Sequence, residues 1–252
     1  MVEYPFLWFQ SVLLASVRLT VGLAMTPLFS AFGMPMLARL LFVLVLAGLA
    51  MQAPNAIVPS ASLDMGFVLP AIGQEFALGL VLSIGVHAAF AAFSVAGRLI
   101  DTQLGFTLGA VLDPVSKGHA AVLSTGLSSL AIVLFFVGDA HQLVLTGYFR
   151  TFELLPVGQS VDWAGWLPLV QAAGGMFSIG FLIAAPVVVA LWLADVVVAV
   201  VARNLPQMNL LFISIPLKVM LGLFVMTVAL YFMAPVADRA LTLPVQMLDK
   251  VI

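Results

Sequence analysis

Side chains able to do chemistry are few and scattered in this chain. There are three histidines, His87, His119 and His141, and there is no cysteine. The histidine spacing does not predict a metal cluster, and there is no HExxH pair, phosphate-binding GxxxxGK[ST] loop or G-x-S-x-G elbow. Without a nucleophile–base pair or a metal constellation, the sequence predicts no catalytic residue, no metal site and no cofactor, and therefore a protein that is not an enzyme.

Charged side chains inside apolar segments are the remaining candidates for a special role. Asp195 is the only aspartate well inside an apolar segment, whereas intramembrane aspartyl chemistry needs two carboxylates that share a site. Lys218 lies one or two turns into another such segment and must snorkel or pair. Because an unpaired charge there costs at least ~2–3 kcal/mol, we expect Lys218 and Glu75 each to have a polar partner.

Composition places these residues in a membrane protein. The chain is 63% hydrophobic and 8% charged, with a net charge of −2, whereas soluble domains are about 25% charged. Long uncharged runs must be helical in lipid, because lipid offers the backbone no hydrogen-bond partners. The runs are continuous rather than alternating, which argues against a β-barrel. No basic cluster is present, so nucleic acid is not an expected partner.

Hydrophobic runs predict an all-α membrane protein with about six long helices in a single membrane domain, residues 1–252. The third and fifth runs are overlong, and Pro186 should kink the fifth. A retained helix rather than a signal peptide is expected at the first run, since Glu3 precedes it. The polar stretch Gly138–Trp166 is expected to be a loop. The runs are Phe6–Met25, Leu37–Gln52, Gly66–Gly97, Ala120–Val137, Val170–Ala202 and Leu211–Met233.

A ridge of small and polar residues recurs every fourth position in the third run, and consists of Glu75, Gly79, Ser83 and His87. One interpretation is that the ridge faces a pore or a proton pathway, because ionisable groups in membrane helices usually face the interior. The other is that its small residues allow close helix packing, while Glu75 finds a donor on a neighbouring helix.

The segment Gly97–Gly109 is polar and glycine-bearing and follows the overlong third run. It contains Asp101, Gln103, Gly105 and Phe106, and Asp113-Pro114 follows shortly after it. Asp113 could cap a helix that starts at Pro114. A re-entrant plug is the alternative, because irregular backbone is tolerated at membrane depth only inside protein or a water-filled cavity.

A second polar turn, Arg203–Asn209, joins the last two runs into a hairpin and includes Pro206 and Gln207. Basic residues give a weak signal of orientation. The positive-inside rule narrowly favours a cytoplasmic location for Arg39, Arg98, Lys117 and Arg203 over Arg150, Arg239 and Lys250.

Taken in order along the chain, these features resemble the FliR family of flagellar biosynthetic proteins and its homologues in type III secretion systems. The residues that carry the resemblance are Arg18, Pro27, Pro35 and Arg39; Glu75 and Gly79; Gly97, Asp101, Gln103, Gly105 and Phe106; Asp113-Pro114; Gly138-Asp139-Ala140-His141; and Pro206, Gln207, Asn209, Pro216 and Lys218. Where the family loop reads Asp-Gly-His, this chain has Ala140 in the middle position.

The resemblance implies a subunit of the flagellar export gate in the bacterial inner (cell) membrane, at the flagellar basal body. It would pack with FliP-like and FliQ-like subunits, and with a FlhB-like subunit, into a helical channel for unfolded export substrates, surrounded by membrane lipid. Residues 1–166 would resemble a FliP-like part and residues 167–252 a FliQ-like hairpin.

The resemblance also favours the plug interpretation, and maps the plug onto residues 103–117. Glycines there loosen the backbone while large apolar side chains exclude water. Assembly contacts are expected at the buried polar positions Glu75, Asp101, Asp195, Arg203, Pro206, Gln207 and Lys218. The plug residues are Gln103, Gly105, Phe106, Gly109, Leu112, Asp113 and Pro114. The rival function is a secondary transporter, in which Glu75, Asp195 and Lys218 would form a midplane site.

Overall fold

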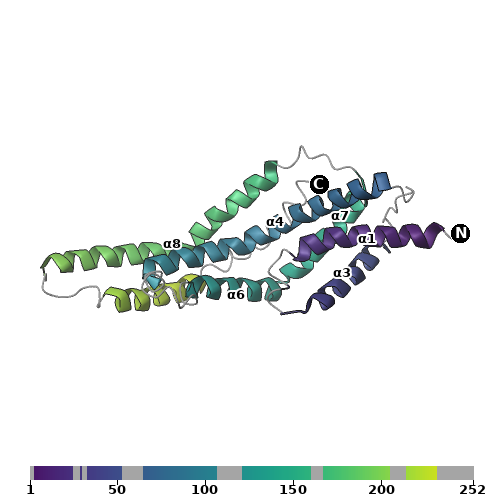
Figure 1. Ribbon diagram of the computed structural model, residues 1–252. Coiled ribbons are helices and arrows are strands. Elements are labelled where there is room, and N and C mark those ends of the chain that lie inside the picture. The colour runs from purple at the N-terminus through teal and green to yellow at the C-terminus, as the bar shows by residue number, and fades with distance from the viewer. Residues whose placement is uncertain are drawn as a thin grey trace, which may run out of the picture. The chain divides into compact units, whose positions relative to one another are not determined.

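The computed structural model describes residues 3–24, 29, 33–52, 65–106, 121–159, 167–204 and 214–231, and these residues are helical apart from short turns (Figure 1). The helices are α1 (Glu3–Ala24), α3 (Met36–Ala50), α4 (Met65–Leu104), α6 (Val122–Val137), α7 (Ala140–Leu154), α8 (Leu167–Asn204) and a last helix, Ser214–Tyr231. The predicted all-α membrane class is confirmed.

Among the described residues, four helices are long and apolar enough to cross a membrane: Phe6–Leu23, Gly66–Leu104, Gly174–Asn204 and Ser214–Tyr231. A fifth candidate is the pair α6 and α7, which meet at an angle of 71°. The run at residues 37–52 was expected to be one of about six long helices, but α3 has only 15 residues. At 1.5 Å per residue it reaches about 22 Å, which is short of the ~30 Å hydrocarbon core.

The expected loop at Gly138–Trp166 is wrong for its first half, which forms α7. This helix is amphipathic: its inner face buries Ala140, Val144, Tyr148 and Phe152, spaced four residues apart. Polar residues on the outer face lower the average hydropathy and hide the helix from a search for apolar runs. A sharp turn separates α6 from α7, and its Asp139 has a left-handed backbone, with φ of 55°.

Helix α4 is longer than the sequence predicts. It was expected to leave the helical conformation at Gly97, but it continues to Leu104, so Asp101 and Gln103 are helical. Gly105 ends it with φ of 80°, and its N–H donates to the Thr102 carbonyl at 3.2 Å. This is a common way to end a helix, because glycine adopts a left-handed backbone without strain.

The chain divides into two compact units that interleave along the sequence. Unit 1 comprises residues 1–89, 135–173 and 241–252, and unit 2 comprises residues 90–134 and 174–240. Unit 1 therefore contains α1, α3, α7 and the first part of α4, and unit 2 contains the end of α4, most of α6 and α8, and the helix Ser214–Tyr231. Helix α8 continues on both sides of Pro186.

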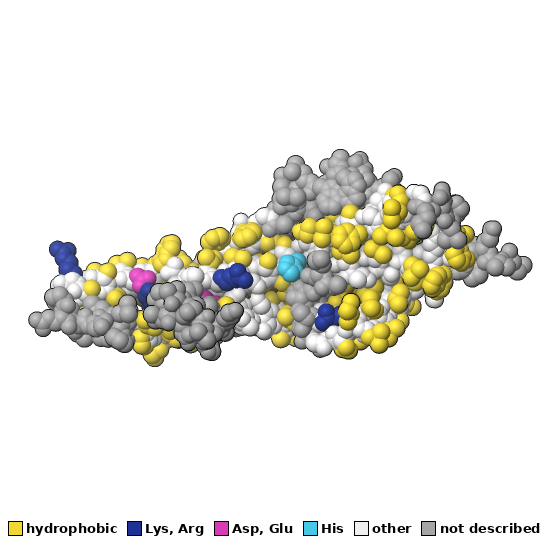
Figure 2. All heavy atoms as spheres, in the orientation of Figure 1, with side chains coloured by type: hydrophobic (Ala, Val, Ile, Leu, Met, Phe, Trp, Pro, Cys, Tyr) yellow, Lys and Arg dark blue, Asp and Glu magenta, His cyan; other side chains and the backbone are white. Residues whose placement is uncertain are grey.

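Hydrophobic side chains remain widely exposed. Figure 2 shows them over much of the coloured surface on one face, with only scattered charged groups. Burial is lowest in the two membrane-length helices of unit 2. In an 18-residue window of Gly174–Asn204, 28% of the residues are buried, and in Ser214–Tyr231 only 11% are buried. Apolar surface of this extent requires lipid or partner helices to cover it.

Candidate functional site

Arg18 of α1 is fully buried at the centre of unit 1, and all five of its N–H groups have acceptors. Nε and Nη2 donate to the two Glu75 carboxylate oxygens at 2.7 and 3.0 Å. Nη1 donates to the Thr151 carbonyl and hydroxyl oxygens at 3.1 and 3.3 Å, and Nη2 also reaches the Leu155 carbonyl at 3.0 Å. One side chain thus ties α1 to α4 and to the end of α7.

Several weaker effects stabilise the guanidinium in this place. Thr151 and Leu155 lie in the last turn and at the C-cap of α7, where the helix dipole favours a positive charge. The Phe152 ring lies under the guanidinium, with its centroid 4.4 Å from the Arg18 Cζ, a distance at which cation–π attraction operates. A buried arginine is tolerated when such contacts replace its hydration.

Glu75 of α4 is 1% exposed and has a third contact besides the two from Arg18. The Gly158 N–H donates to its Oε1 at 3.0 Å. Gly158 has φ of 80° in the turn after α7, a conformation that favours glycine. Glu75 therefore holds this turn against α4. The polar partner expected for the Glu75 charge is present, and it is Arg18.

The ridge that begins at Glu75 is a packing surface over most of its length. A Cβ at Gly79 would lie 2.6 Å from the Arg18 carbonyl oxygen, so only glycine allows α1 to approach this closely. Ser83 is buried and donates to the Leu80 carbonyl in its own helix. His87 is exposed. For Glu75 and Gly79, the structure supports the packing interpretation rather than the pore-facing one.

Asp101 forms the main polar contact of unit 2. Its two carboxylate oxygens accept hydrogen bonds from the Leu123 and Ser124 N–H groups, each at 3.0 Å. These N–H groups belong to the first turn of α6 and have no acceptor inside that helix. A buried carboxylate at this position caps α6 from α4 and complements the positive end of its dipole. We call this contact the Asp101 cap.

Small side chains bring α4 and α6 together next to the Asp101 cap. A Cβ at Gly97 would lie 2.3 Å from the Ser124 Cα, so the two helices touch backbone to backbone. One turn earlier, the Ser94 and Ser128 hydroxyls are 2.7 Å apart, and the Ser124 hydroxyl donates to the Ser94 carbonyl at 3.1 Å. Ser94, Gly97 and Asp101 thus form one polar face of α4.

Lys218 and Asp195 form an ion pair between the last helix and α8. Their side chains are 18% and 43% exposed, which is more open than the Arg18–Glu75 pair. The expected polar partner of Lys218 is therefore present. Arg203 is exposed in the last turn of α8, where a cation is favoured by the helix dipole.

The predicted plug residues lie partly inside the described structure. Gln103 belongs to the last turn of α4, Gly105 ends the helix, and Phe106 is half-buried. The other predicted site residues lie outside the described residues: Gly109, Leu112, Asp113, Pro114, Pro206 and Gln207. No group of three or more His, Cys, Asp or Glu side chains able to hold a metal ion occurs in the described part of the chain.

Sequence reasoning missed the partner of Glu75. Arg18 is a lone cation in an apolar helix, and this alone marks it as a residue that needs a buried anion. The carboxylate that supplies it lies 57 residues away, and no spacing rule connects the two. Likewise, Ser94, Ser124 and Ser128 carry no signal beyond their small size.

Comparison with known proteins finds a family match over most of the chain. The family described as bacterial export proteins, family 1, matches residues 9–243. The flagellar biosynthetic protein FliR of Bacillus subtilis is 27% identical over 242 residues, which cover 94% of this chain and 93% of the relative. Escherichia coli FliR is 28% identical over 76% of each chain, and the Yop proteins translocation protein T of Yersinia pestis is 24% identical over 77% of each.

Proposed function

The chain belongs to the bacterial export proteins, family 1, and on this basis we propose that it is a channel subunit of a flagellar type III export gate. Its role would be structural, to help form and plug the conduit for unfolded export substrates in the inner membrane at the flagellar basal body. We favour the flagellar branch because the match to the Bacillus FliR covers 94% of this chain, whereas the Escherichia coli FliR and the Yersinia secretion protein cover 76% and 77% alike.

The observation that carries this proposal is the length of apolar helix that remains uncovered. The Gly174–Asn204 stretch of α8 has 31 residues, and an 18-residue window within it has a mean hydropathy of 2.5 with 28% of its residues buried. The whole stretch extends about 46 Å, whereas the hydrocarbon core measures ~30 Å. Lipid can therefore cover only part of this surface, and apolar helices of other subunits would have to cover the rest.

The partners that fit this surface are the FliP-like, FliQ-like and FlhB-like subunits of the gate. Helix α8 and the helix Ser214–Tyr231 would act as the FliQ-like hairpin within residues 167–252, and residues 1–166 would act as the FliP-like part. A hairpin with apolar outer faces and an internal Lys218–Asp195 pair suits packing beside a row of similar hairpins, because it satisfies its own charges before assembly.

The Asp101 cap supports a plug between α4 and α6. Helix α4 ends at Leu104 and α6 begins at Val122, and Asp101 binds the first turn of α6 directly. The end of α4 and the first turn of α6, which bracket residues 107–120, are therefore held together in unit 2. Gly105 ends α4 with a backbone conformation that glycine adopts without strain. A segment closed at its base in this way could move within a channel without separating the helices that carry it.

The rival transporter reading requires Glu75, Asp195 and Lys218 to serve one substrate site. In the structure Glu75 is neutralised by Arg18, and Asp195 is neutralised by Lys218. Charges that are already paired in this way have little left with which to bind an ion or substrate. No specific observation favours the transporter.

Purification from the membrane in mild detergent tests the proposal. A gate subunit should emerge with several different small membrane proteins in a fixed ratio, which mass spectrometry of the intact complex would measure. A chain that emerges alone or only with copies of itself, while a tagged neighbouring gate component from the same cells purifies without it, would overturn the proposal.

A further inference from the structure

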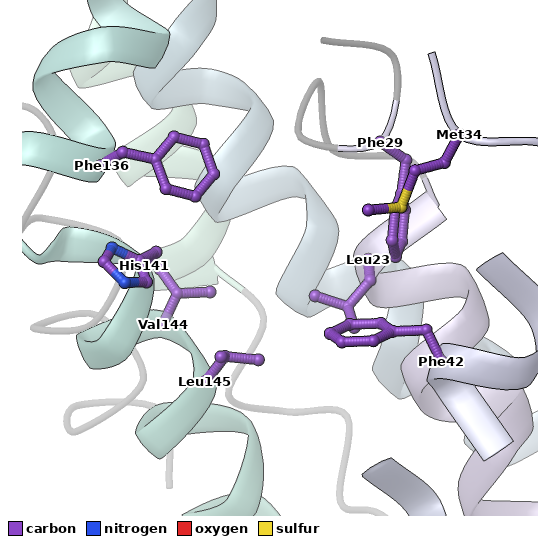
Figure 3. Close-up of a pocket in the computed structure, with 8 residues that line it drawn as sticks. All are labelled: Leu23, Phe29, Met34, Phe42, Phe136, His141, Val144 and Leu145. Carbon is purple, nitrogen blue, oxygen red and sulfur yellow. The ribbon is translucent and has the colours of Figure 1, made fainter. Parts of the chain in front are cut away.

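A cavity of about 190 Å³ lies within unit 1, between the end of α1, α3 and the elbow of α6 and α7. Figure 3 shows side chains from both sides that face one another across it. Its walls include Leu23, Phe29, Phe42, Phe136, Val144 and Leu145. An apolar cavity of ~150 Å³ is enough to take up benzene, so this space could hold several methylene groups of a chain.

The cavity reaches the molecular surface beside α3. Two of its lining side chains, Met34 and Phe42, are 37% and 43% exposed. The outer face of α3 continues from there as an apolar surface formed by Leu37, Leu41, Val45 and Leu49. A hydrocarbon chain that lies along α3 could therefore enter the cavity without crossing a polar barrier.

In the described part of unit 1, the cation of Arg39 lies at the rim of this cavity. Arg39 Nε donates to the Met34 carbonyl at 2.9 Å, and Nη2 donates to the Phe29 carbonyl at 3.3 Å. Its Cζ is 5.8 Å from the centroid of the Phe29 ring. Met34 and Phe29 both line the cavity, so the guanidinium is fixed at the point where the apolar wall ends.

The surroundings leave the charge of Arg39 unbalanced among the described residues. Its two hydrogen bonds go to neutral carbonyl groups, and the first turn of α3 contains no acidic residue. Arg39 also lies near the N-terminus of α3, where the helix dipole adds positive potential rather than cancelling it. An anion at the rim would be stabilised by the charge of Arg39 and by the dipole of α3.

From this arrangement we propose that unit 1 binds one anionic phospholipid, with an acyl chain in the cavity and the phosphate beside Arg39. An apolar slot with one cation at its mouth matches an amphiphile that carries a negative head group, and basic residues beside apolar surface attract anionic lipids in this way. A free phosphate would leave the apolar cavity empty, and a neutral lipid would leave the Arg39 cation without an anion. The site stands independently of the role in export.

Native mass spectrometry of the complex in which the chain purifies, with lipid added back in mild detergent, tests this site. The probes are palmitoyl-oleoyl phosphatidylglycerol and the corresponding phosphatidylcholine, each added separately. Unchanged protein should retain phosphatidylglycerol preferentially. Arg39→Gln should weaken its retention about fivefold, equivalent to the ~1 kcal/mol of one basic residue beside an anionic lipid, and should leave phosphatidylcholine unchanged.

Two further variants test whether lipid binding needs the cavity and the position of Arg39, and not only a positive charge somewhere on the chain. Met34→Trp fills the mouth from an exposed position and should abolish retention of both lipids at this site, with helicity checked by circular dichroism. Arg98→Gln removes an exposed arginine from unit 2 and should change nothing. Equal losses in Arg39→Gln and Arg98→Gln, equal retention of the two lipids by the unchanged protein, or full retention in a helical Met34→Trp variant would each overturn the proposal.

Discussion

Removal of both members of the Arg18–Glu75 pair should destabilise unit 1 by less than the sum of the two single removals. In a Glu75→Gln variant the guanidinium stays buried, but it keeps only the carbonyl and hydroxyl contacts of Thr151 and Leu155 and a neutral amide. An uncompensated buried charge of this kind costs about 3–5 kcal/mol. Arg18→Met should cost a similar amount, because it strands the carboxylate.

The double variant Arg18→Met with Glu75→Leu leaves no buried charge. It still leaves the Gly158 N–H and the Leu155 carbonyl without their hydrogen-bond partners. Each unpaired group costs about 1–3 kcal/mol of stability. We therefore expect a loss of about 2–6 kcal/mol in the double variant, against about 6–10 kcal/mol for the sum of the two single variants. The midpoints of these two ranges differ by about 4 kcal/mol, and this is the coupling energy that we expect.

The assay is the sodium dodecyl sulfate concentration at the midpoint of helix loss, followed by circular dichroism, when the complex purified in mild detergent is titrated with that detergent. The exposed Glu153 supplies a control, since Glu153→Gln should change stability by less than ~0.5 kcal/mol. Additivity of the two single variants within ~0.5 kcal/mol would refute the pairing. If the double variant were stable and assembled but exported nothing, the pair would act in transport rather than in packing.

Other outcomes follow from the same geometry. Chain expressed without partners should aggregate rather than give a monodisperse monomer in gel filtration, because its apolar outer faces stay uncovered. Lys218→Met alone should lower the yield of assembled complex by stranding Asp195, while the double change with Asp195→Asn should restore it; a Lys218→Met variant that assembles yet exports nothing would contradict this. A disulfide between Ser94→Cys and Ser128→Cys, whose hydroxyls are 2.7 Å apart, should leave export intact, and a block that a reductant relieves would show that the base of the plug must open.

Helix positions followed from the sequence wherever a run was apolar on all sides. The first run and α1 differ by only a few residues at each end, because an uncharged run of that length has no other stable form in lipid. Amphipathic α7 was missed because its polar face masks the apolar spacing of Ala140, Val144 and Tyr148. Gly97 was taken as a helix end, whereas its missing side chain serves contact with α6.

Partners of the charged residues were less accessible to sequence reasoning. The need of Glu75 and Lys218 for a partner follows from the cost of burying a charge, but the identity of that partner depends on which helices touch. Asp101 shows the same limit: local rules look for the cap of a helix in the residue before it, and here the cap of α6 comes from α4. Long-range contacts of this kind leave no periodic trace in the sequence.

The most direct test of the central claim is the ion conductance of membranes that carry the assembled complex with Phe106–Leu112 deleted. Gly105 and the Asp101 cap remain in this variant, so the base of the segment should hold and co-purification of the other subunits should be unchanged. A deletion of equal length at residues 160–166, between α7 and α8, serves as the control. The account predicts an ion leak in the first variant and none in the second. Normal assembly without added leak after deletion of Phe106–Leu112 would contradict it and return the segment to the role of a connector between helices.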